Sequence, residues 1–220
     1  MRRLAGSGKP GAPTAVENLV RFVRANSSAF ATVVLIIRSS TQLSDATLQS
    51  HVNSIRQLDP KKRRKLLDLV QGFYQHANQS GGGDLANMRG AFVELMCFSA
   101  LPFDRKLRRT SRLQKYATVH VIDQDGKRVC DVAMSADVGW EDEKAESREI
   151  LECKVNVRSW LSNAADSDPK IAYLRCVLGH LQRVGEVRVG LAGLDTKRDP
   201  RLPPDLACIT YEDLKRSVSA

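Results

Sequence analysis

The sequence predicts an α/β protein with a mixed sheet flanked by helices, preceded by a mostly helical N-terminal subdomain. Three observations lead to this fold class. Residues 14–80 carry apolar side chains at helical spacing, and short β-like runs with an Asp-Gly turn follow residue 116. A further helical run then separates the third β-like run from the fourth. A strand meander followed by a helical crossover is typical of a mixed sheet covered by helices.

The first element after the N-terminus is a helix. Residues 1–13 contain glycines, prolines and charges, so we expect a flexible tail there. Thr14 is a suitable N-cap, with Glu17 three residues later as in a capping box. The apolar run 29–37 fits either a strand or a buried helix, because its length does not decide between them.

Two further helices complete the N-terminal subdomain. Ser44 is expected to cap a helix that runs to about Leu58. Asp59 and Pro60 are a cap followed by proline at the first helical position, so the next helix begins there. Three glycines at 81–83 end this section and divide residues 14–80 from residues 84–220.

The second section has the order α-β-β-β-α-β-β-α. Asp125-Gly126 is a strong signal for a two-residue hairpin turn, which would place His120 opposite Asp131. An acidic loop, 141–149, is expected between the second and third strands. The expected helices are 88–101, 168–183 and 211–218, and the expected strands are 117–122, 128–134, 149–157, 186–192 and 207–210.

The net charge of +9 is distributed unevenly. Residues 61–115 carry a net charge of +8, whereas residues 116–220 carry −3. Clusters of this kind suit a polyanion such as nucleic acid, although solvated helix ends are the alternative. The basic residues that form the two clusters, and that we expect to bind nucleic acid, include Lys61, Lys62, Arg63, Arg64, Arg105, Lys106, Arg108, Arg109 and Arg112.

The composition excludes several classes of protein. The longest apolar run, 29–37, is far shorter than the roughly 20 residues that cross a bilayer. No apolar core of signal-peptide type follows the first residues, so we expect a cytoplasmic protein without a membrane segment. The five cysteines are widely spaced and form no C-x-x-C pair, and the histidines show no H-x-x-x-H spacing. We therefore expect reduced cysteines and no zinc site.

The third strand carries the most informative polar residues. Glu152 and Lys154 project from one face of it, while Cys153 points the other way. Burying either the carboxylate or the ammonium alone within an apolar strand would be costly, so both are expected to have a use at this position. A metal-dependent phosphodiester site is one such use, in which Glu152 binds a hard cation and Lys154 steadies a phosphate oxygen or the attacking water. An exposed ion pair on an edge strand is the alternative.

Two other acids stand in apolar surroundings. Asp131 is the only charge within residues 129–134, and Asp137 has the same parity six residues later, so it replaces Asp131 if the strand is longer. Glu94 is the only acid within the apolar helical run 91–98 and is expected to need a partner if it is buried.

These three elements together resemble the PD-(D/E)xK nuclease superfamily, which has the restriction-endonuclease-like fold. The resemblance rests on a helix glutamate (Glu94), a strand acid (Asp131) and the tripeptide Glu152-Cys153-Lys154, in an α-β-β-β-α-β order over residues 84–192. Cys130 stands where the motif has proline. Residues 84–220 would then form the nuclease-like domain.

The resemblance implies Mg²⁺- or Mn²⁺-dependent hydrolysis of nucleic acid, DNA more than RNA. Asp131 and Glu152 would ligate the cation with the Cys153 backbone carbonyl, and Glu94 would bind a second ion or a water. Lys154 would position the attacking water and offset charge in the transition state. Homodimers are common among such enzymes. The alternatives are an inactive nucleic-acid-binding module on the same fold and a regulatory protein-interaction domain.

Overall fold

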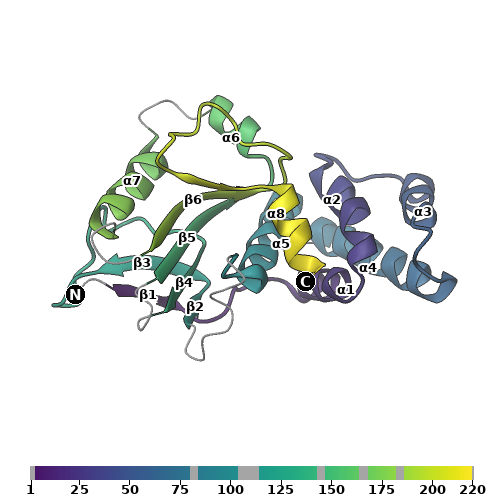
Figure 1. Cartoon of the computed structure of the whole chain (residues 1–220). Helices are drawn as coiled ribbons and strands as arrows, with labels where there is room; N and C mark the ends of the chain where they lie inside the picture. Colours follow the sequence, from purple (N-terminus) through teal and green to yellow (C-terminus); the bar gives the residue numbers. More distant parts are fainter. Residues whose placement is uncertain are drawn as a thin grey trace.

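A computed structural model of the chain describes residues 3–79, 84–103, 114–142, 147–163, 168–181 and 186–219 (Figure 1). It has the mixed α/β architecture expected from the sequence, with a five-stranded mixed sheet, a two-stranded sheet and flanking helices. The helices on the N-terminal side are α1 (Thr14–Ala25), the 3-10 turn η1 (Ser27–Ala29), α2 (Phe30–Arg38), α3 (Asp45–Asn53) and α4 (Pro60–Gln79).

Capping side chains explain where several of these helices begin. The Ser44 hydroxyl accepts a hydrogen bond from the backbone N–H of Thr47 at the start of α3, as predicted. Asp59 accepts from the N–H of Lys62 at the start of α4. The predicted Thr14 cap is wrong, because Thr14 is already helical and the carbonyl of Pro13 accepts the first bonds of α1.

The apolar run 29–37 is a helix, since most of it lies in α2 and packs into the core on several sides. Within the described residues, no single helix is long and apolar enough to cross a membrane. The segments 14–25 and 27–38 pass that test of length and composition only when they are taken together, and they are bent by 116° relative to each other.

The main sheet has the strand order β2-β4-β5-β6-β7. Strand β4 is antiparallel to β5, and β5 is parallel to β6, which in turn is parallel to β7. Two helices, α6 and α7, connect β5 to β6, as a crossover between parallel strands requires. The remaining elements are β1 (Arg3–Ser7), α5 (Asp84–Ala100), β2 (Gln114–Tyr116), β3 (Thr118–Ile122), β4 (Val138–Asp142), β5 (Ser147–Lys154), α6 (Val157–Asn163), α7 (Pro169–Leu181), β6 (Val187–Gly193), β7 (Ala207–Ile209) and α8 (Tyr211–Val218).

The sheet separates two hydrophobic clusters, because side chains alternate between its faces. On one face, Leu151 and Cys153 of β5 join a cluster that extends through α5 and α8 into α1–α4. On the other face, Ile150 of β5 packs with Leu174 of α7. Figure 1 shows the N-terminal helices gathered on one side of the sheet and α7 on the other. The N-terminal helices therefore share a continuous core with the sheet.

The N-terminal residues differ from the expectation of a flexible tail. Arg3–Ser7 form β1, which pairs antiparallel with β3 over its whole length. Leu4 of β1 is buried in the cluster beneath α7. Burial of this side chain and the ladder of backbone hydrogen bonds together hold the segment in place.

The predicted strand 128–134 is also wrong. The hairpin loop contains three residues, with Gly126 at φ +78°, so Ile122 pairs with Arg128. The backbone leaves the ladder at Cys130, whose φ is +64°. Pairing resumes only where Ala136 meets Val119, and the next strand is β4, whose last two residues fall within the expected acidic loop 141–149.

The expectation for the cysteines is partly wrong. Cys130 and Cys176 form a disulfide, with Cα atoms 5.9 Å apart, between the segment before β4 and helix α7. Cys97, Cys153 and Cys208 are free, as expected. The disulfide could not be predicted from the sequence, because its cysteines are 46 residues apart and only the crossover of the chain brings α7 beside the hairpin.

Replacing Gly190 in β6 is expected to destabilise the protein. A Cβ atom at this position would lie 2.0 Å from the carbonyl oxygen of Ala207 in β7, so β7 would have to move. We expect Gly190→Ala to lower the free energy of unfolding by about 3 kcal/mol and the melting temperature by roughly 10 °C, as measured by circular dichroism. Gly72→Ala in α4 is the matched control, since no atom lies within 4 Å of its Cβ position. It is expected to stabilise the protein by about 0.5–1 kcal/mol, so a similar loss in both variants would contradict this prediction.

Candidate active site at the end of strand β5

The centre of the candidate site lies where β4 begins and β5 ends. Val138 pairs with Leu151 in the antiparallel register, so Asp137, just before β4, stands beside Glu152. The Oδ2 atom of Asp137 accepts a hydrogen bond of 2.7 Å from the backbone N–H of Cys153. The sheet register therefore brings these two carboxylates together.

Glu152 is almost fully buried, with 2% of its surface exposed. Its Oε1 atom accepts a hydrogen bond of 2.7 Å from the ammonium of Lys154. Its Oε2 atom lies 3.1 Å from the ammonium of Lys170, an ion pair that lacks hydrogen-bond geometry. The two ammonium groups offset the charge of this buried carboxylate at the carboxyl end of β5.

Lys170 connects this carboxylate to the segment before β4. It lies in the first turn of α7, and its ammonium donates a 2.7 Å hydrogen bond to the carbonyl oxygen of Ser135. The Lys170 side chain thus contacts both Glu152 and the backbone of Ser135, which lies two residues before Asp137. Lys170 could not be predicted from the sequence, because the crossover that lays α7 over the sheet is a tertiary feature.

Lys154 also contacts an aromatic ring. Its ammonium lies 5.4 Å from the centroid of Trp160, a residue of α6, at a distance typical of a cation–π interaction. Asn156 accepts a hydrogen bond from the N–H of Ser159 and so caps α6. The helix that follows β5 therefore begins at the site and helps to orient its lysine.

Glu94 approaches the site from α5, on the other face of the sheet. Burial, and then the charge of Glu152, raise the pKa of Glu94 above its ordinary value. The pKa of Asp137 is raised to about 7 by burial and by the same glutamate, against the lowering effect of the Cys153 N–H. Burial lowers the pKa of Lys154, but the neighbouring carboxylate outweighs it, and the net shift is upward. The three acids and the lysine therefore share one electrostatic environment.

A pocket of about 550 Å³ opens beside these groups. Glu94, Asp137 and Lys154 line it, and Glu152 lies behind them. The N-terminal part of the chain also lines the pocket, through Pro13 and, from the last turn of α4, His76. His76 could not be predicted from the sequence, since nothing local connects α4 with the sheet.

The structure separates the two aspartates that the sequence left as alternatives. Asp131 is exposed, and its carboxylate accepts a hydrogen bond of 2.9 Å from the N–H of Ala133 in a turn. Asp131 therefore does not lie beside Glu152, as a metal ligand on the neighbouring strand would. Asp137 has that place instead. Of the predicted catalytic residues, Glu94, Glu152 and Lys154 lie together, and Asp131 does not join them.

The first basic cluster lies at the opposite end of α4 from the site. Lys61, Lys62, Arg64 and Lys65 are exposed, whereas the guanidinium of Arg63 donates to the carbonyl oxygen of Ile55 and helps to fix the preceding turn. The exposed side of the cluster borders a groove of about 470 Å³ between α1 and α4, lined by Lys62, Lys65 and Arg21. The residues of the second cluster, Arg105, Lys106, Arg108, Arg109 and Arg112, lie outside the described residues.

The donor atoms of the site suit a hard cation. Carboxylate and peptide oxygens are the ligands that Mg²⁺ prefers. Among the described residues, however, the closest grouping of three potential metal ligands lies elsewhere. The ligand atoms of Cys130, Cys176 and His180 all lie within 4.8 Å of one another. The three carboxylates are less closely gathered, so side-chain rotation must precede shared coordination.

Comparison with known proteins adds no assignment. No protein-family model matches the chain, and no curated protein shows significant similarity to it. The chemistry of the site is therefore inferred from the arrangement of its own residues.

Proposed function

We propose that this protein is a metal-dependent nuclease of the restriction-endonuclease-like type, which hydrolyses phosphodiester bonds of nucleic acid, DNA more than RNA. The observation that carries the proposal is the meeting of Glu94, Asp137, Glu152 and Lys154 beside an open pocket. Two strand acids, a lysine two residues after the second acid and a glutamate from a preceding helix form the set that the resemblance requires. Asp137 takes the role first given to Asp131.

The topology around the site supports the same proposal. Helix α5 precedes the sheet, β4 and β5 are antiparallel, and β6 returns parallel to β5 after a helical crossover. Counted within the main sheet alone, α5, β2, β4, β5, the α6–α7 crossover and β6 follow the α-β-β-β-α-β order that the resemblance implies, whereas β3 pairs with β1 instead. The E-x-K tripeptide lies at the carboxyl end of β5, where Cys153 and Lys154 line the pocket and Glu152 lies behind them.

Each residue has a role consistent with its position. Asp137 and Glu152 would hold a Mg²⁺ or Mn²⁺ ion together with the Cys153 carbonyl, and that ion would supply charge neutralisation at the scissile phosphate. Burial and then the negative charge of the neighbouring acids raise the pKa of Asp137, and the same negative charge favours a cation there. Lys154 would release its ion pair with Glu152 and hold the attacking water or a phosphate oxygen.

The basic end of α4 would bind the same substrate further along its backbone. Fifteen residues separate Lys61 from His76, which corresponds to about 22 Å along a helix. A single strand with 3.4 Å per nucleotide covers that distance in about six nucleotides. The groove between α1 and α4 would then contact phosphates outside the cleavage site, which predicts binding that weakens as salt increases.

Removing the Lys154 ammonium is expected to stop cleavage without preventing binding. Purified chain is incubated with single- and double-stranded DNA and RNA in Mg²⁺, Mn²⁺ or EDTA, and products and binding are measured. We expect cleavage only with metal, and we expect Lys154→Ala to reduce its rate about 100-fold or more, with nucleic-acid affinity within about twofold. Lys215→Ala is the matched control, because this lysine also lies over an aromatic ring, that of Tyr211, but on α8.

The other outcomes decide between the alternatives. Cleavage in EDTA, or equal rates for Lys154→Ala and wild type, would contradict the proposed mechanism. Salt-sensitive binding without cleavage by the wild type would favour the inactive nucleic-acid-binding module. Absence of both would favour a protein-interaction domain. Sedimentation with and without DNA tests for a homodimer.

A further inference from the structure

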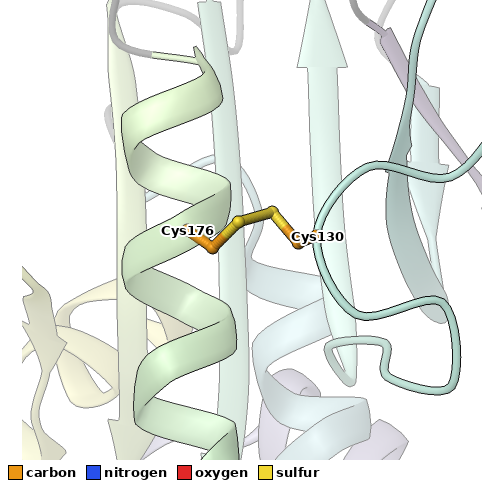
Figure 2. The surroundings of a disulfide bond; sticks show 2 residues. All are labelled: Cys130 and Cys176. Carbon is orange, nitrogen blue, oxygen red and sulfur yellow. A yellow bond between two sulfur atoms is a disulfide. The ribbon is translucent and has the colours of Figure 1, made fainter.

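The disulfide lies within a group of three potential metal ligands away from the carboxylate site. Cys176 and His180 are four residues apart on α7, so their side chains share one face of the helix. Cys130 faces them from the segment before β4, and Figure 2 shows its bond to the middle of the helix. The two sulfur atoms and an imidazole nitrogen all lie within 4.8 Å of one another, and all three residues are half-buried.

We propose that Cys130, Cys176 and His180, once the disulfide is reduced, form a binding site for a soft divalent cation such as Zn²⁺. Two thiolates and one imidazole are a ligand set that selects zinc over the hard cations favoured by carboxylates. Three protein ligands leave the fourth position of a tetrahedral ion to water. The site is distinct from the carboxylate site, and its occupation does not depend on the proposed nuclease activity.

The backbone geometry suits both states of the cysteines. Tetrahedral coordination with Zn–S bonds of about 2.3 Å places the two sulfurs about 3.8 Å apart. With Cα atoms 5.9 Å apart, this separation is reached by rotation about the Cα–Cβ bonds. Cys130 already has φ of +64°, a conformation that a residue other than glycine rarely adopts, and it directs the sulfur toward α7.

Reduction and metal binding are linked steps. A dithiol reductant supplies two electrons and two protons to the disulfide, which becomes two thiols while the reductant becomes a cyclic disulfide. The cation then displaces one proton from each thiol and binds the resulting thiolates with the neutral imidazole of His180. The oxidised chain has no thiolate at either position, so it is expected not to bind the cation there.

The position of the group indicates what the cation would stabilise. Residues 128–136, here termed the clamp loop, lead directly into Asp137. The cation would hold the clamp loop to the second and third turns of α7, and Lys170 already holds it at the first turn through the carbonyl of Ser135. Either the disulfide or the cation would thus cross-link the loop to α7, whereas the reduced, metal-free chain would keep the hydrogen bond from Lys170 but lose this cross-link.

Cobalt binding to the full chain tests this proposal. The protein is reduced with a dithiol, transferred to reductant-free anaerobic buffer and titrated with Co²⁺, whose thiolate charge-transfer and tetrahedral d–d absorption report the ligand set. We expect about one Co²⁺ per reduced chain, displaceable by Zn²⁺, and no such absorption from the oxidised chain. Cys176→Ser and His180→Ala are each expected to lose the tetrahedral spectrum.

Three controls keep the result interpretable. Cys208→Ser removes a half-buried free cysteine outside the group and is expected to bind Co²⁺ like the wild type. Asp137→Asn is expected to do the same, which separates this site from the carboxylate site. His180→Ala retains the disulfide, so its fold is verified in the oxidised form before reduction. The proposal is overturned if the folded, reduced wild type shows no thiolate-to-cobalt absorption, or if Cys176→Ser retains it.

Discussion

Asp137→Asn is expected to lower the rate of metal-dependent cleavage by about three orders of magnitude, whereas Asp131→Asn is expected to leave it within about twofold. The two aspartates are six residues apart, and the sequence pattern favours Asp131, with Asp137 as the alternative if the strand is longer. They differ in environment, because Asp137 lines the pocket beside Glu152 and Asp131 is exposed in a turn. Loss of a metal ligand removes several kcal/mol of transition-state stabilisation.

The Asp137→Asn variant tests the negative charge of this side chain separately from its hydrogen bond. An amide oxygen still accepts the hydrogen bond from the Cys153 N–H, so the end of β5 keeps its position. The substitution also removes one of the negative charges that repel each other in the site, and the variant is expected to melt at or above the wild-type temperature. Loss of activity then cannot come from unfolding.

Initial cleavage rates at several Mg²⁺ concentrations, with melting temperatures, test the assignment. A large loss of activity in Asp131→Asn with an active Asp137→Asn would show that the structure places the wrong aspartate in the site. Equal losses in both variants would point to a role for the clamp loop as a whole.

Arg148→Met is expected to lower the free energy of unfolding by about 3–5 kcal/mol, because it leaves a buried carboxylate without its main partner. The guanidinium Nε of Arg148 donates a 2.9 Å hydrogen bond to Glu141, and both side chains are essentially inaccessible to solvent. Glu141 also accepts weaker bonds from the backbone N–H of Leu4 and the hydroxyl of Tyr116. The pair therefore joins β4 and β5 to β1.

Chemical denaturation and thermal melting measure this effect, which corresponds to a melting temperature lower by roughly 10 °C. Arg175→Met is the matched control. Its side chain is 59% exposed and pairs with Asp205 at 3.0 Å, so the loss is expected to be about 1 kcal/mol or less. The double variant Glu141→Gln, Arg148→Met should recover part of the loss, since neither of these two positions then carries a charge. Equal effects of Arg148→Met and Arg175→Met would contradict the prediction.

Local signals predicted most of the secondary structure. The Ser44 cap and the Asp59-Pro60 pair marked helix starts correctly, since the atoms that satisfy a helix terminus are adjacent in sequence. The alternation in residues 150–154 predicted which side chains of β5 face each way. The prediction of a strand at 128–134 was wrong because Cys130 adopts a left-handed backbone conformation. This residue forms a disulfide with Cys176, which is 46 residues away in the sequence.

The sequence by itself determined the fold class, the β5 strand with Glu152 and Lys154, and the isolated glutamate of α5. Each depends on periodicity or on a few adjacent residues, and such local preferences survive in the folded chain. Only the tertiary structure decided between Asp131 and Asp137, brought Lys170 and His76 to the site, and joined Cys130 to Cys176 and His180. These outcomes depend on sheet register and on the crossover through α7, where small shifts in pairing change which distant side chains meet.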